Sequence, residues 1–72
     1  MKYFQIWFKS QYHSDEYFGK AESIFQCEAR FNQWYDTGKE REYGELLEFG
    51  CVEVSPGEYY VREKTNPKII LF

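Results

Sequence analysis

The residues best able to do chemistry in this chain are one histidine, His13, and two cysteines, Cys27 and Cys51. His13 stands beside Asp15 and Glu16, and a histidine next to carboxylates can act as a general base or a metal ligand. A zinc site needs three or four converging ligands, and a nucleophilic cysteine needs a partly exposed, electropositive pocket. We therefore expect a solvated loop histidine, no metal, no cofactor and no enzymatic activity.

The two cysteines are expected to be reduced, buried and apolar in character. They do not form a Cys-x-x-Cys pair, and two cysteines are far fewer than a secreted disulfide scaffold contains. A Cys27–Cys51 bridge stays open only for an exported chain, and Met1-Lys2 leads into mixed aromatic and polar residues rather than an apolar signal segment. The sequence contains no apolar run that is long enough to predict a membrane span. We expect a soluble, cytoplasmic protein.

Glu28 is a candidate for a buried polar contact. On a helix it would project from the middle of an apolar stripe, close to Ile24. A half-buried carboxylate needs a partner, such as a tyrosine hydroxyl, Lys20 or a basic group of the sheet or of another molecule. We expect a structural contact within the chain.

The aromatic content is the most informative compositional fact. Aromatic residues make up 22% of the 72 residues, and each ring can bury about 150–250 Å². A core this small cannot hold them all, so some rings must be exposed. Exposed tyrosine and tryptophan are typical of protein interfaces and of base-stacking platforms.

The predicted interaction surface is the face of a sheet that points away from its helix. It comprises Tyr3, Trp7, Lys9, Tyr60 and Arg62. Aromatic anchors inside a mixed-charge rim are typical of protein-binding hot spots. Single-stranded nucleic acid is the alternative ligand, but the net charge of −3 and the lack of an RNA-recognition signature disfavour it.

The elements that must position these residues follow from the hydrophobic pattern. Tyr3 to Ser10 alternates as a strand does. Residues 14–37 predict one amphipathic helix, which begins near Ser14 or only at Lys20 and ends at Gly38 as a left-handed terminus. The alternation of residues 25–31 leaves a strand open there, so this stretch is a helix or begins as a strand.

The C-terminal half predicts a hairpin. Residues 39–43 form a charged connector, and Glu45 to Val54 form a strand with a β-bulge next to Gly50. Ser55-Pro56-Gly57-Glu58 fits a type II turn, and residues 59–64 then alternate as a second strand.

The predicted fold is α+β, a single domain over residues 1–72. Its order is β-α-β-β, with Ile69 to Phe72 closing a sheet edge as a final strand or docking on the helix. One helix would lie across an antiparallel-rich sheet of three or four strands. A small all-β barrel is the alternative fold.

We expect a small module of this kind to act by docking on a larger protein and blocking or altering it. Small acidic α+β proteins are common among the viral proteins, encoded by phages, that disable host enzymes or defence systems. This comparison is an analogy of size and composition only. We therefore expect an inhibitor or accessory factor. The most specific version of this hypothesis is an anti-defence role. Single-stranded nucleic-acid binding and self-association into a homodimer are the alternatives.

Overall fold

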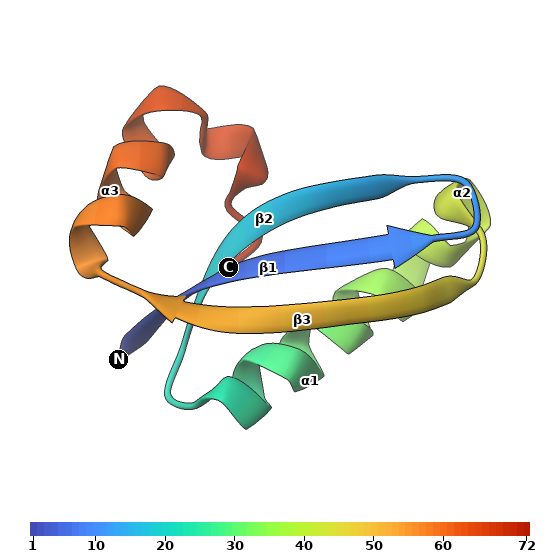
Figure 1. Ribbon diagram of the computed structural model, residues 1–72, viewed down its shortest axis with the longest axis horizontal. Coiled ribbons are helices and arrows are strands. Elements are labelled where there is room, and N and C mark those ends of the chain that lie inside the picture. The colour runs from blue at the N-terminus through green and yellow to red at the C-terminus, as the bar shows by residue number, and fades with distance from the viewer.

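The computed structural model describes residues 1–72 as an open antiparallel sheet with helices around it (Figure 1). In chain order the elements are β1 (Lys2–Ser10), β2 (Ser14–Ala21), α1 (Ile24–Trp34), a π-helical turn (Tyr35–Lys39), α2 (Glu40–Tyr43), β3 (Leu46–Val54), α3 (Pro56–Thr65) and a 3-10 turn (Pro67–Ile69). The strand order is β2-β1-β3. The α+β class and a three-stranded sheet are confirmed, and the barrel is excluded because the sheet does not close. None of the helices is long and apolar enough to span a bilayer.

The central strand β1 forms as its alternation predicts. Phe4, Ile6 and Phe8 are buried on one face, which we call the inner face of the sheet. Tyr3 and Trp7 point to the opposite, outer face, because neighbouring side chains of a strand alternate.

Residues 14–21 are a strand, so a helix beginning near Ser14 or Lys20 is wrong. β2 pairs antiparallel with β1, from Lys9 opposite Ser14 to Lys2 opposite Ala21. This pairing allows Tyr17 and Ala21 to be buried against the core, which outweighs the weak local preference for helix. The element order is therefore β-β-α-β-α rather than β-α-β-β.

The main helix begins and ends later than the sequence predicts. The Ser23 side chain caps α1 by accepting a hydrogen bond from the Gln26 backbone N–H at 3.2 Å. The helical path then continues through Gly38 into α2 and ends at Gly44, whose φ is +81°. The predictions of a connector at residues 39–43 and of a left-handed helix terminus at Gly38 are therefore both wrong. Gly44 is the helix terminus.

β3 occupies the predicted residues, but its irregularity lies elsewhere than at Gly50. Gly50 pairs regularly with Trp7, whereas the register shifts between Lys9 and Ser10 of β1. Lys9 lies opposite Glu48 and Ser10 opposite Leu46, which leaves Leu47 as the extra residue.

Residues 56–65 form helix α3, so the predicted hairpin is wrong. The Ser55 hydroxyl accepts a hydrogen bond from the Glu58 backbone N–H at 3.3 Å, and Pro56 occupies the first turn. A serine followed three residues later by glutamate, with proline in between, is also a typical helix start. Tyr59 of this helix is almost fully buried.

The C-terminal residues cover the edge of β2 that does not pair with β1. Of the two predicted placements, at a sheet edge or on the helix, the sheet edge is therefore confirmed. The Leu71 N–H donates to the Phe18 carbonyl at 2.9 Å, and the Lys20 N–H donates to the Phe72 carbonyl at 3.0 Å. Ile70 forms an isolated parallel bridge with Phe18. The opposite edge of the sheet, along β3, stays unpaired.

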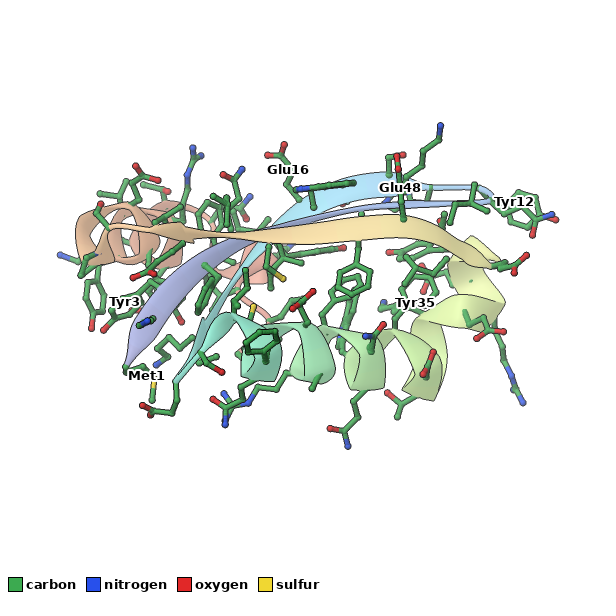
Figure 2. All side chains as sticks on the ribbon, turned by 60° about the horizontal axis from the view of Figure 1, so that its bottom comes forward. Met1, Tyr3, Tyr12, Glu16, Tyr35 and Glu48 are labelled. Carbon is green, nitrogen blue, oxygen red and sulfur yellow. The ribbon has the colours of Figure 1, made fainter.

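The core lies between the inner face of the sheet and the helical segment of α1 (Figure 2). Its buried members are Phe4, Ile6, Phe8, Tyr17, Ala21, Cys27, Phe31 and Tyr35. Phe31 stacks on Phe49 with the ring centroids 4.9 Å apart. Tyr35 lies between the two layers, and its hydroxyl donates to the Gly44 carbonyl at 2.6 Å. This bond ties the end of the helical segment to the core.

Candidate protein-interaction surface

The outer face of the sheet is built by side chains from all three strands. Residues opposite one another in antiparallel strands share a face. The register therefore places on this face Tyr3, Gln5, Trp7 and Lys9 of β1, Ser14, Glu16, Phe18 and Lys20 of β2, and Glu48, Gly50, Val52 and Val54 of β3.

Helix α3 covers one end of the outer face, where β1 begins (Figures 1 and 2). The Tyr59 ring packs 5.0 Å from the Tyr3 ring, and its hydroxyl donates to the Phe72 carbonyl at 3.2 Å. Phe18, which the alternation points outward, is buried. The outer face is therefore divided into a covered end and an open end.

Tyr60 and Arg62 lie on α3, not on a strand as predicted. The structure still brings Tyr60 to Tyr3, with their hydroxyl oxygens 2.8 Å apart. This hydrogen bond raises the pKa of Tyr3. The Arg62 guanidinium lies 5.7 Å from the centre of the Phe18 ring, a cation–π distance. Both residues thus border the covered end.

The open end is centred on Trp7, whose side chain is 41% exposed. Its indole lies over Gly50, where an added Cβ would come within 2.6 Å of Nε1. Val52, 52% exposed, adds a second apolar group on the neighbouring strand. Glycine opposite an aromatic residue lets the ring cover the strand, which holds it in place.

Polar side chains surround Trp7 on this open end. Gln5 Nε2 donates to Glu16 Oε2 at 3.1 Å, and Lys9 lies opposite Glu48. We call this surface the Trp7 face; it comprises Gln5, Trp7, Lys9, Glu16, Glu48 and Val52. Of the predicted site residues, Trp7 and Lys9 lie within it. Tyr3 adjoins it, about 13 Å from Trp7 along the strand, and Tyr60 of α3 contacts Tyr3.

The contacts of His13 are structural rather than catalytic in type. Its ring stacks on Tyr43 with the centroids 4.2 Å apart, and Nε2 lies 3.3 Å from Asp15 Oδ2. No group of three or more His, Cys, Asp and Glu side chains is placed to hold a metal ion. Burial raises the pKa of Tyr17 and that of Tyr59, so neither phenol is poised to act as a base.

Glu28 lacks the polar contact that we expected. It is half-buried on α1 and makes no hydrogen bond or ion pair. The helix turns Cys27 and Phe31 toward the sheet, so that Glu28 lies on its flank within reach of solvent.

The cysteines lie in contact, which their spacing did not predict. Cys27 of α1 is fully buried, Cys51 of β3 is only partly buried, and their sulfur atoms are 3.5 Å apart. Both are free thiols. The signal that could have placed them together is the position of each on the core face of its own element.

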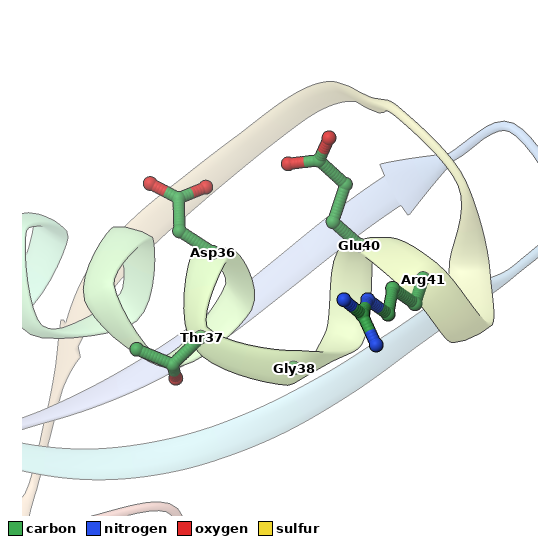
Figure 3. A pocket seen from close by; sticks show the side chains of 5 residues that line it. All are labelled: Asp36, Thr37, Gly38, Glu40 and Arg41. Carbon is green, nitrogen blue, oxygen red and sulfur yellow. The ribbon is translucent and has the colours of Figure 1, made fainter.

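A hollow lies along the π-helical turn and the start of α2 (Figure 3). It is lined by Asp36, Thr37, Gly38, Glu40 and Arg41. None of these side chains is hydrophobic. Figure 3 shows the two carboxylates on one side of the segment and Thr37 on the other. Binding sites for small molecules are mostly apolar and enclose the ligand, so this hollow offers no such site.

No family model, no curated protein and no solved structure matches this chain.

Proposed function

We propose that this protein is an interaction module that docks on a larger protein through the Trp7 face. The observation that carries the proposal is the open end of the sheet, where Trp7 and Val52 are exposed while the inner face is filled by the core. An aromatic anchor held flat on a rigid strand loses little conformational entropy on binding, and its polar rim can exclude water from the contact.

The finer proposal is that docking blocks or alters the partner, which makes the protein an inhibitor or accessory factor. Its small size and acidic composition support this, and they also support an anti-defence role for a phage-encoded protein. Single-stranded nucleic acid is disfavoured because Lys9 is the one cation of the Trp7 face, which also holds the carboxylates of Glu16 and Glu48.

The test is affinity purification of the tagged protein from lysate of its source organism, or of the host cell if a phage encodes it. A stoichiometric protein partner should be recovered and should be lost with Trp7→Ala and weakened with Tyr60→Ala. For Trp7→Ala we expect a loss of about thirtyfold in affinity, measured by calorimetry with the purified partner.

Phe25→Ala is the matched control. Phe25 is 79% exposed on α1, on the helical layer opposite the Trp7 face, and its loss should leave binding unchanged. Normal binding by both Trp7→Ala and Tyr60→Ala would show that the face is wrongly assigned. Recovery of nucleic acid alone would favour the alternative ligand.

Self-association is a second candidate, favoured by one specific observation. The edge of β3 from Leu46 to Val54 pairs with no other strand, although Glu48, Glu53 and the extra residue Leu47 oppose its pairing. Such an edge presents free backbone N–H and C=O groups to another chain.

A further inference from the structure

Two thiols from distant parts of the chain meet at the contact between α1 and β3. Cys27 and Cys51 are separated by 24 positions in the sequence, and their sulfur atoms lie 3.5 Å apart. A disulfide holds its sulfurs at about 2.05 Å, so closure needs an approach of about 1.5 Å. The proposed bond therefore requires rotation of the two cysteine side chains toward each other.

We infer that Cys27 and Cys51 form an oxidisable dithiol, a modification site that closes to an intramolecular disulfide by exchange with a small-molecule disulfide of the glutathione class. This inference does not depend on the proposed docking function.

The two thiols have different parts in the exchange. Cys51 is partly buried on the edge strand, whereas Cys27 is fully buried beneath it. The Cys27 S–H donates to Cys51 Sγ, which lowers the pKa of Cys51 and raises that of Cys27. Cys51 is therefore the attacking thiol and Cys27 the resolving thiol.

The reaction balances with one small disulfide. The Cys51 thiolate attacks one sulfur of the reagent, forming a mixed disulfide and releasing the first small thiol. Cys27 then attacks Cys51 Sγ, which forms the internal S–S bond, and the departing small thiolate takes the proton that Cys27 gives up and leaves as the second small thiol. Two protein thiols are oxidised and one small disulfide is reduced to two thiols.

The product would fasten an edge of the sheet to the helical layer. β3 is hydrogen-bonded on one side only, through β1. A Cys27–Cys51 bond would add a covalent link between this strand and α1. We expect the oxidised chain to resist thermal unfolding better than the reduced chain, because the bridge restricts the unfolded state.

The experiment uses the purified chain, without denaturant, in mixtures of oxidised and reduced glutathione. Samples are quenched with acid and a thiol-alkylating reagent and then measured by intact mass. We expect a monomer that has lost two hydrogen atoms and both free thiols, with a higher melting temperature that dithiothreitol reverses. Two remaining thiols under excess oxidised glutathione, or bridging only in urea, would overturn the inference.

Single-cysteine variants test the order of the steps. Cys27→Ala should retain one glutathione on Cys51, because no resolving thiol remains, whereas Cys51→Ala should stay unmodified. Equal modification of the two variants would contradict the assigned parts. The wild-type mass measurement still decides the pairing if either variant fails to fold.

Discussion

At the scale of single residues, Gly44 is the position with the strictest backbone requirement. It is the one residue with positive φ, and a Cβ added there would come within 2.7 Å of Gln11 Cβ. Gly44→Ala should lower the free energy of unfolding by about 1–3 kcal/mol, measured by urea denaturation, because the left-handed backbone and the contact both disfavour a side chain.

Gly38→Ala is the matched control for that measurement. Gly38 lies in the helical path with nothing within 4 Å of an added Cβ. Its substitution should leave stability unchanged or raise it by up to about 1 kcal/mol, because alanine favours helix. Equal losses for the two variants would contradict the assignment of Gly44 as the helix terminus.

Which of these two glycines ends the helix could not be predicted from the sequence. Glycine is common just past the end of a helix, so the local sequence permits a terminus at either position. The choice is made by tertiary contacts, since the Gly44 carbonyl accepts the buried Tyr35 hydroxyl and its backbone packs against Gln11. Trp7 and Lys9, by contrast, were placed correctly on the outer face from the alternation of β1 alone.

At the scale of elements, α3 depends on its N-terminal cap. The Ser55 hydroxyl accepts a backbone hydrogen bond, and Tyr59 of the same helix packs on Tyr3. Ser55→Ala should lower the free energy of unfolding by about 1 kcal/mol, measured by thermal or urea denaturation. Ser14→Ala, at an exposed position of β2, should have no measurable effect. An equal effect of both variants would contradict the capping role.

A strand can be predicted from the sequence when only one of its faces is covered, because its residues then alternate between apolar and polar. β1 alternates clearly in the sequence and is confirmed, and β3 is confirmed although its alternation changes phase next to Gly50. β2 lacks clear alternation because Tyr17 is buried toward the core while its neighbour Phe18 is buried on the outer side. A strand covered on both faces loses the two-residue period by which a strand is recognised.

The misplacement of α3 has a different cause. Ser55-Pro56-Gly57-Glu58 satisfies the rules for a type II turn and for a capped helix alike. The packing of Tyr59 on the sheet favours the helix, and that contact joins residues far apart in the chain. The prediction therefore put Tyr60 and Arg62 on the correct side of the sheet but in the wrong element.

At the scale of the whole molecule, coverage of the sheet is uneven. The inner face is filled by the core, α3 covers one end of the outer face, and the C-terminal residues cover the edge of β2. The Trp7 face and the edge of β3 remain open. The proposed docking and the alternative self-association each use one of these two surfaces, so the oligomeric state separates them.

We expect a monomer of 8.8 kDa at all concentrations from low micromolar to millimolar, measured by sedimentation equilibrium. A second copy could pair antiparallel along β3, but the extra residue Leu47 distorts one end of the strand, and Glu48 and Glu53 give it negative charge. Bulges and charged side chains are features that discourage pairing between sheet edges.

A mass that rises with concentration toward twice that value would contradict this expectation. Leu47→Lys should then restore the monomer, because it adds a charge at the edge, whereas Trp7→Ala should leave the dimer intact. Loss of the dimer with Trp7→Ala instead would mean that the Trp7 face binds a second copy of the chain, and the partner in the proposed function would be the protein itself.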